Sequence, residues 1–362
     1  SALWGPLLLL SMACALWVWS GSAGSLRTVL QVLAWSLPAG QQLSSADVQG
    51  NLREGGQLGL LRWQSQGLQV EARGAHIALD WSLLWRQPWP VRSIHLEALN
   101  IEDQRPPQPM TALSSLKLPL PVQMSLQIQQ MTWKGATTLM LSHVQADYAY
   151  DGHEHSLHVN SLTLAKGQYT LQARLQAAAP MALNIGLQGQ VQTPSTDRNA
   201  ATQLALQSTV QGTLSGMQAE LSVTAQLAPK LAPSLKESTS TRAQDAPHLD
   251  LQALIRPWQK QPVVQAQAQW QALDLAPLWP GAPQTRLNGQ SNVKPEGDAW
   301  LLDAQLTNLT PGPWDQARLP VSQLRVRARH HLGLWQVQQL QAEFGQRLAS
   351  GGAQQMDELR MT

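Results

Sequence analysis

The chain has 362 residues, with 25 Lys and Arg against 23 Asp and Glu, so its net charge is +2 and only 13% of its residues are charged. A soluble domain carries about 25% charged residues, and here glutamine, at about one residue in eight, replaces much of the missing charge. The near-zero net charge argues against nucleic-acid binding, and the abundant leucine argues against disorder. The single cysteine, Cys14, excludes an intramolecular disulfide framework and a multi-cysteine metal site.

An uncharged apolar run occupies residues 2–19 and ends on Trp17 and Trp19. Eighteen helical residues span about 27 Å, close to the thickness of the hydrocarbon core, and tryptophan favours the membrane interface. The sequence therefore predicts a transmembrane signal-anchor in residues 1–24. Cleavage as a signal peptide among the small residues at 20–24 is the alternative. In both cases we expect the rest of the chain to be exported, with Cys14 an unreactive small residue of the span.

Apolar residues at helical spacing follow the anchor and stop at Pro38 and Gly40. They predict a short amphipathic helix in residues 25–40. Because it directly follows the span, we expect it to lie on the membrane surface or to plug the first strands. The apolar positions are Leu26, Val29, Leu30, Leu33 and Leu37.

From about residue 45 the hydrophobic period changes from 3.6 to 2. Residues 265–272 alternate glutamine with alanine or tryptophan at every position. Residues 169–177 also alternate apolar with polar side chains. Alternation of period 2 gives a strand one apolar and one polar face. We expect about sixteen strands and almost no helix beyond residue 40.

Several predicted strands change phase midway. The apolar series passes from Leu96 to Leu99, and from Ile128 to Met131. A one-residue phase shift requires a bulge or a bend. Gly-containing pairs such as Asp151-Gly152 and Lys134-Gly135 predict hairpin turns between strands.

Two segments interrupt the strand pattern. Residues 105–121 are proline-rich and predict an extended connector, and residues 229–247 are polar and predict a flexible linker. The predicted organisation is therefore a first β segment at 41–228 and a second at 248–362.

The composition limits the architecture of such a sheet. An apolar sheet face exposed to water costs about 25 cal/mol per Å², so it must meet a second sheet, close into a barrel, or curl into a trough that binds something apolar. With 1 Phe in the chain, the apolar faces are mostly Leu, Val, Ala and Met. Such an aliphatic lining favours a trough for acyl chains over a closely packed core.

No residue pattern favours catalysis. Asp151, His153, His155 and His158 resemble a metal cluster, but Asp151-Gly152 predicts a turn and His158 falls on the opposite strand face, so a solvated hairpin is favoured. The pair His330-His331 also lies at a predicted turn. Ser114 and Lys117 match a β-lactamase spacing by letter only, inside the proline-rich connector. We therefore predict no enzyme activity, no cofactor and no metal.

Three tryptophans, Trp81, Trp85 and Trp89, gather within nine residues. They suit either a lipid or membrane contact or a hydrophobic turn on the edge of the sheet, and the turn is the favoured interpretation.

The predicted anchor and the helix ended by proline are followed by short strands that carry Gly50 and Leu52, Gly67, Leu68 and Val70, and Leu79, Trp81 and Leu84. The order of these features resembles the N-terminal region of the TamB family, the inner-membrane subunits of the translocation and assembly module, and their AsmA-like relatives. The resemblance covers nearly the whole chain. Family members are longer and end in a β domain that contacts the outer-membrane partner TamA, which implies that this chain is an N-terminal fragment.

The resemblance implies a mainly β fold with an elongated, curled, antiparallel or mixed β-trough. It also implies a periplasmic bridge, anchored in the inner membrane through residues 2–19, that conducts phospholipid towards the outer membrane and supports assembly of outer-membrane and autotransported proteins. From the alternation, we expect phospholipid acyl chains to contact Met124, Leu126, Ile128, Leu171, Leu175, Leu183, Ile185, Leu187, Val264, Ala266, Ala268 and Trp270.

Two other functions remain open from the sequence. An outer-membrane β-barrel also alternates in strands of about ten residues, although aromatic girdles are scarce here. A secreted β-rich adhesin or passenger domain would show a cleaved signal and a regular rung repeat, and no repeat is detected.

Overall fold

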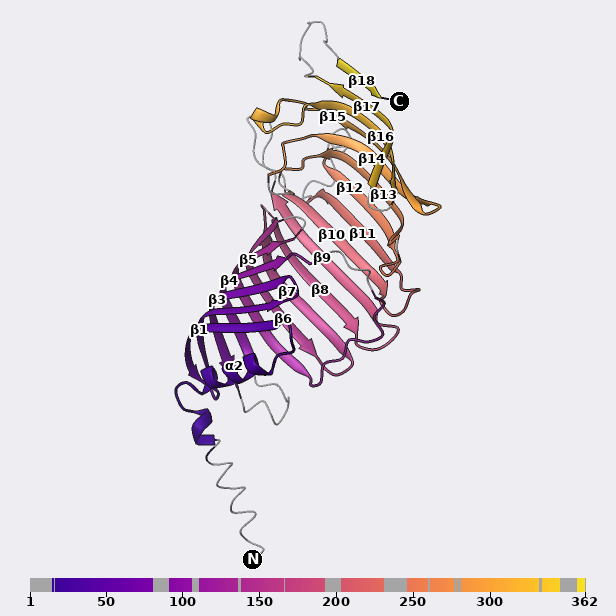
Figure 1. Cartoon of the computed structure of the whole chain (residues 1–362). Helices are drawn as coiled ribbons and strands as arrows, with labels where there is room; N and C mark the ends of the chain where they lie inside the picture. The colour runs from indigo at the N-terminus through magenta and orange to yellow at the C-terminus, as the bar shows by residue number, and fades with distance from the viewer. Residues whose placement is uncertain are drawn as a thin grey trace, which may run out of the picture. The chain divides into compact units, whose positions relative to one another are not determined.

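The computed structural model describes residues 15, 17–80, 91–105, 111–135, 138–165, 167–192, 203–230, 246–259, 261–276, 278, 281–331, 334–345 and 357–361. The chain divides into two compact units, Ser1–Gln108 with Lys117–Leu164 and Pro109–Leu116 with Ala165–Thr362. Strands dominate both units, which confirms the predicted mainly β fold (Figure 1).

The first unit contains one long helix and seven strands among its described residues. Each strand pairs with the next along the chain, and all pairs are antiparallel except β4 with β5, which makes the sheet mixed. The elements are α2 (Ser25–Ser36), β1 (Gln41–Asn51), β2 (Gly55–Ser65), β3 (Leu68–Leu79), β4 (Val91–Asp103), β5 (Val122–Lys134), β6 (Thr138–Tyr150) and β7 (Glu154–Leu164).

The second unit continues the same order, with every described pair antiparallel between consecutive strands. Among the described pairings β18 bonds only to β17 and β1 only to β2, so the sheet is not closed. The elements are β8 (Gly167–Gln176), β9 (Ala182–Gln192), β10 (Gln203–Thr213), β11 (Leu221–Pro229), β12 (His248–Ile255), β13 (Val263–Leu273), β14 (Leu287–Glu296), β15 (Ala299–Asn308), the short 3₁₀ helix η4 (Trp314–Gln316), β16 (Val321–His331), β17 (Leu334–Phe344) and β18 (Asp357–Met361).

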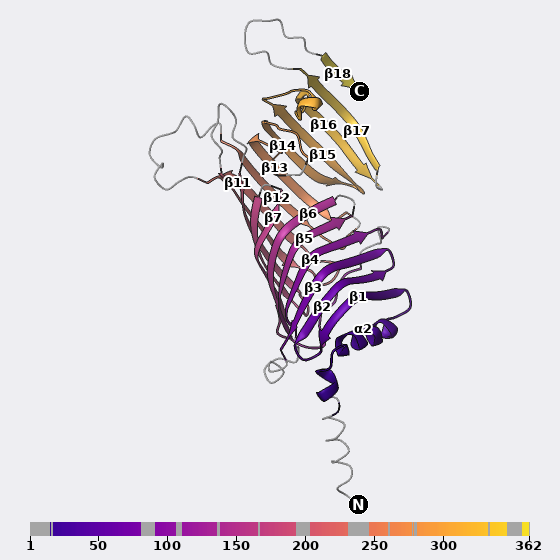
Figure 2. The ribbon, with the colours of Figure 1, turned by 90° about the vertical axis from the view of Figure 1, so that its left-hand side faces the viewer.

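Helix α2 covers residues 25–36 of the amphipathic helix predicted at 25–40, and it lies beside β1 at one end of the first unit (Figure 2). Leu26 is only 6% exposed and belongs to a core cluster with Leu58, Ala72 and Leu96, while Leu30 packs against that cluster. The start of the helix therefore packs on the first strands, which is one of the two placements expected from the sequence.

A line of unpaired residues crosses β1 to β6 at the predicted phase shifts. One residue in each of these strands makes no described pair, while the pairing register is the same on both sides of it. The phase shift is therefore shared by neighbouring strands and is a bend, not a bulge. Glu97 and Ala98 separate Leu96 from Leu99 in β4, and Gln129 and Gln130 separate Ile128 from Met131 in β5, so the apolar residues on both sides of the unpaired line stay on one face. The unpaired residues are Asp47, Gly59, Gly74, Glu97, Gln129 and His143.

The two interrupting segments have different placements. In the connector, Leu113 and Ser115 form single β-bridges to Ser215 and Ala178, and the Leu116 amide donates to the Ala177 carbonyl at 2.8 Å, all within the second unit. The strands that flank the predicted linker 229–247, β11 and β12, pair directly with each other, and residues 231–245 lie outside the described part.

Most of the predicted anchor, residues 1–14 and 16, also lies outside the described residues, including Cys14. Among the residues that are described, no helix is long and apolar enough to cross a membrane. The anchor therefore stays a prediction.

Substituting Gly74 by Ala should test the line of unpaired residues. Gly74 has φ +58°, and an added Cβ would lie 2.4 Å from the Glu97 side chain. We expect Gly74→Ala to lower the free energy of unfolding by about 1 kcal/mol, the cost of a left-handed non-glycine residue. Urea denaturation of the detergent-solubilised chain measures it.

The matched control is Gly186→Ala in β9, because an added Cβ there meets no atom within 4 Å. We expect no loss of stability from this control. Equal loss of stability in both variants would contradict a specific requirement for glycine at position 74.

Candidate functional site

One face of the first unit is apolar across all its strands. The register places Val48 opposite Leu58, Leu58 opposite Ala75, and Leu96 opposite Ile128. Residues paired across strands share a face, so one apolar row runs across the sheet, and parallel rows flank it. The neighbouring rows contain Leu61, Ala72, Leu99, Met131 and Leu141, and Ile77, Ile94, Leu126, Ala146 and Val159.

The three lining residues predicted in β5 belong to this apolar face. Ile128 is 3% exposed and lies in the core cluster, Leu126 packs against that cluster, and Met124 is opposite Tyr148 of β6. The alternation of β5 is thus preserved in three dimensions. Ile128 is buried in the cluster, so its exposure to any ligand is small.

A tyrosine–histidine cluster ends the apolar face at the β6–β7 hairpin. The Tyr148 hydroxyl and His155 Nδ1 form a 2.7 Å hydrogen bond, and the Tyr150 ring stacks on the His155 ring with centroids 4.4 Å apart. Burial raises the pKa of Tyr148 above its ordinary value. This cluster places polar groups on a mainly apolar face, and sequence reasoning missed it because cross-strand register is needed to see it.

The second unit has an equivalent apolar face. The predicted lining residues pair with each other, with Leu171 opposite Leu187, and Leu175 opposite Leu183. In β13, Ala266 is opposite Ala253, Ala268 opposite Leu251 and Trp270 opposite Leu249. The register therefore brings these predicted residues onto one continuous face.

Val264 is the exception among the predicted lining residues. The pairing shifts between Leu254 and Ile255, which face Gln265 and Val263. Val264 therefore lies at a bulge with no residue of β12 directly opposite.

Small side chains form a lane across the second unit. From β10 to β15 the register links one residue in each strand, and leucine is the only large one. Adjacent strands are about 4.8 Å apart, so these six strands carry the lane over about 24 Å. We call these residues the small-residue lane: Ser208, Ala225, Leu251, Ala268, Ser291 and Ala304.

The lane lies beside a row of larger residues on the same face. Leu206, Leu227, Leu249 and Trp270 are opposite one another in β10 to β13. The small-residue lane therefore forms a shallow path beside a taller apolar wall.

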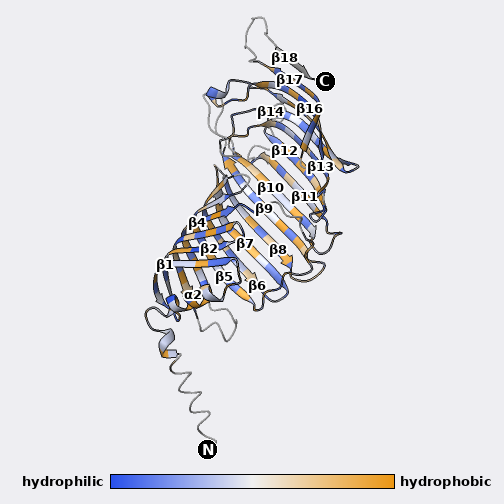
Figure 3. Cartoon of the chain, in the orientation of Figure 1, coloured by the Kyte–Doolittle hydropathy of each residue, from blue (hydrophilic) through white to orange (hydrophobic). Residues whose placement is uncertain are grey.

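The two faces of the sheet differ in exposure. Ile185 and Ala268 are partly exposed, whereas their sequence neighbours Asn184 and Gln267 on the other face are exposed. Apolar and polar residues alternate along the strands in Figure 3. The apolar face of β8 to β13 thus keeps accessible surface that an apolar ligand can cover.

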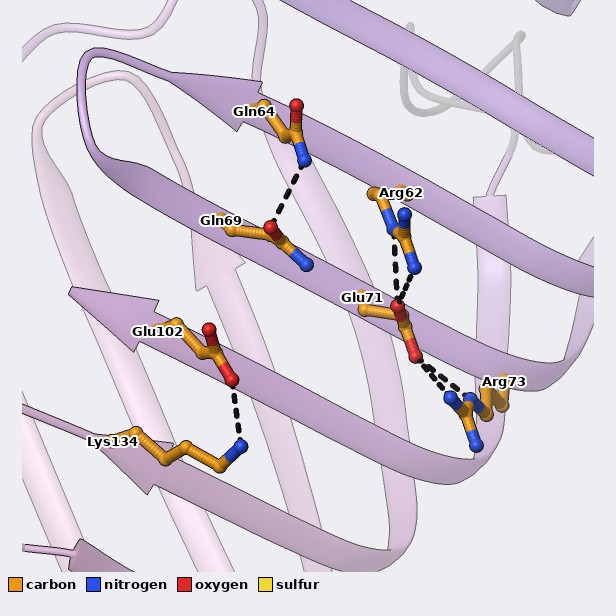
Figure 4. Close-up of polar contacts among 7 residues, drawn as sticks. All are labelled: Arg62, Gln64, Gln69, Glu71, Arg73, Glu102 and Lys134. Atoms are coloured by element: carbon orange, nitrogen blue, oxygen red, sulfur yellow. Dashed lines mark hydrogen bonds and ion pairs between the residues drawn. The ribbon is translucent and has the colours of Figure 1, made fainter. Parts of the chain in front are cut away.

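Polar contacts run across the opposite face of the first unit (Figure 4). Glu71 accepts hydrogen bonds from Arg62 Nε at 3.1 Å and Arg73 Nε at 2.8 Å, and its side chain is 7% exposed. The Arg62 hydrogen bond, followed by Arg73, lowers the pKa of Glu71 despite the opposing effect of burial. Lys134 and Glu102 form a more exposed pair at 2.7 Å.

The polar face of the second unit is hollowed over β12 to β17. A hollow of about 570 Å³ is lined by amide side chains, several of which the register places in one row, and by ionisable residues that include His248, Asp250 and Glu343. Neutral amides suit contact with water. The row includes Gln269, Gln290, Gln305, Arg325 and Gln341.

The candidate metal residues do not converge. Asp151 Oδ1 accepts hydrogen bonds from the backbone amides of His153 and Glu154, which confirms the predicted turn and lowers the pKa of Asp151. His155 lies among the tyrosines, and His158 is opposite Asp147 on the other face. Within the described ranges, no group of three or more His, Cys, Asp or Glu residues is placed to hold a metal ion.

The other candidate residues serve local contacts. His330 stacks on Trp300, and His331 hydrogen bonds to Asp298 at 2.6 Å, which lowers the pKa of Asp298. Ser114 and Lys117 lie outside strands in the connector. The tryptophans at 81, 85 and 89 fall outside the described residues.

Comparison with known proteins gives no match to a family model, a curated protein or a solved structure.

Replacing Glu71 by Gln should destabilise the first unit at neutral pH. The change removes the charge that both arginines bond, and we expect a loss of about 1 kcal/mol. The matched control, Glu102→Gln, removes a more exposed charge on the same face and should cost less. Urea denaturation midpoints measure both.

The effect of Glu71→Gln should depend on pH. A lowered folded-state pKa gives stability that is complete above the ordinary value of about 4.5 and is lost as the pH falls through the folded-state pKa. We therefore expect the difference between the native chain and the variant to shrink in acid. A difference that is constant from neutral to acidic pH would contradict a role for the charge.

Proposed function

We propose that this chain is a membrane-anchored β-trough that conducts phospholipid between the inner and outer membranes of a bacterium. The observation that supports it best is the apolar face of the second unit, which passes from strand to strand with partial exposure. An open sheet is compatible with a trough. The anchor would be residues 2–19, with the body in the periplasm.

The physical argument concerns what the apolar face contacts. Exposed apolar surface costs about 25 cal/mol per Å², and acyl chains would remove that cost while the headgroups stay in water. The small-residue lane supplies room for a chain, and the row from Leu206 to Trp270 supplies apolar contact beside it. Transport along this face would need no covalent step, cofactor or metal.

The resemblance to the TamB family supplies the rest of the proposal. It extends the function to assembly of outer-membrane and autotransported proteins with a TamA-like partner. In the family that partner contacts the C-terminal β domain.

Photo-crosslinking in cells tests the conduit. A benzophenone amino acid in place of Ile185 or Ala268 should capture phospholipid, because both side chains lie on the apolar face. The matched controls are Asn184 and Gln267, their neighbours on the polar face. We expect several-fold more phospholipid from the inner positions by mass spectrometry. Equal capture from both faces would overturn the proposal.

A charge placed in the lane should block it. Ala225→Arg and Ala268→Arg would put a guanidinium among apolar side chains, and we expect the phospholipid that co-purifies with the chain to fall several-fold. Thr224→Arg and Gln267→Arg add the same charge to the exposed polar face and should leave it unchanged. Unfolding temperatures of all four variants distinguish a blocked lane from a misfolded chain. If well-folded lane variants carry an unchanged amount of co-purified phospholipid, the small-residue lane is not the lipid path.

A further inference from the structure

Helix α2 has a second apolar side that the sheet does not cover. Trp35 is 85% exposed and Val32 53%, although Leu26 at the start of the helix is buried in the core cluster. An amphipathic helix that only packs on a sheet normally presents polar residues outward. Here the outward side of α2 carries the most exposed tryptophan among the described residues.

The preceding helical residues expose the same kind of side chain. Trp17 is 60% exposed and Val18 71%. Arg53, in the β1–β2 turn, holds this segment to the unit, because its guanidinium lies 4.3 Å from the centre of the Trp17 ring and donates to the Trp17 carbonyl and the Ser20 hydroxyl.

Backbone and hydroxyl contacts fix α2 to the same turn. The Leu52 amide donates to the Ser20 carbonyl at 3.0 Å and to the Ser25 hydroxyl at 3.1 Å, and the Gly24 amide donates to the Gly50 carbonyl. The helical residues 17–20 and α2 therefore belong to one body with β1 and β2 (Figure 2). Their exposed apolar side chains form a surface of that body, not of a free tail.

The charge distribution identifies the partner of this surface. Between residues 2 and 46 the sequence carries one charged side chain, Arg27, and the first carboxylate is Asp47. The segment is therefore weakly cationic and continuous with the uncharged apolar run at 2–14. Tryptophan with flanking arginine and no carboxylate matches the interfacial region of an anionic bilayer.

We propose that Trp17, Val18, Val32 and Trp35 form a membrane-interface surface that seats the first unit on a phospholipid bilayer. The proposal deepens the proposed function, on which it rests. Helix α2 then lies between the bilayer and the apolar face of the sheet, with Leu26 on the sheet side and Trp35 in the lipid. The apolar face would begin at the membrane surface, where acyl chains are available.

Site-directed spin labelling tests this placement. In the full chain carrying Cys14→Ser, nitroxides at Trp35→Cys and Val32→Cys are compared with Gln42→Cys and Ser44→Cys, exposed positions of β1. The chain is reconstituted in vesicles of phosphatidylethanolamine and phosphatidylglycerol. We expect the α2 labels to collide with oxygen and lose contact with a water-soluble nickel chelate, and the β1 labels to show the reverse.

Three outcomes would overturn the proposal. Nickel access at Trp35 equal to that at Gln42 would place the helix in water. Spin–spin broadening at Trp35 that disappears on dilution with unlabelled chain would identify a second copy as the partner. Protection from nickel without oxygen access would indicate that another part of the protein covers the α2 surface.

The result can be distinguished from failure of the conduit. Vesicle attachment through residues 2–19 would persist in every variant, so only the label depth reports on α2. Lipid capture from Ile185 could remain intact while the α2 surface proves aqueous. Because Trp35 is 85% exposed, its replacement should not disturb folding.

Discussion

The structure depends on strict cross-strand register between strands of period 2. Each strand has one apolar face, and a shift of one residue in any pair would send that face into water for every later strand. From β8 to β16 the register keeps Leu, Ile, Val and Ala opposite one another, with Ser and Gly between them. In the first unit the strand pattern slips by one residue at the line of unpaired residues, where neighbouring strands slip together and the register is kept. In each unit the result is a continuous apolar face.

The low charge of the sequence follows from the same constraint. A long sheet with one apolar face needs a polar face that does not repel itself, and rows of like charges directly opposite would destabilise it. Glutamine fills this role at Gln269, Gln290 and Gln305, while charges occur in compensating contacts such as Arg62–Glu71–Arg73. The glutamine surplus is therefore a property of the polar face and gives no measure of how much of the protein lies in a membrane.

The strands, the amphipathic helix and the phase shifts at Leu96 and Ile128 could be predicted from the sequence, because each depends on local periodicity. Within each unit, most predicted lining residues share one face for the same reason. The small-residue lane and the tyrosine–histidine cluster could not be predicted, since Ser208 and Ala225, or Tyr148 and His155, become neighbours only through pairing register. The parallel β4–β5 pair was equally hidden, because a proline-rich connector does not specify which edge the next strand joins.

The small-residue lane differs physically from a site that holds one ligand. Such a site uses a few convergent polar groups to fix orientation, whereas the lane offers Ala or Ser in five of its six strands. Even the Ser208 hydroxyl is engaged, donating to the Thr224 carbonyl at 2.9 Å. An acyl chain moving by one strand spacing would exchange nearly equal contacts, so the barrier between successive positions would be low. A surface that binds similarly at every strand favours sliding over retention, and that is the physical requirement for a conduit without an energy source of its own.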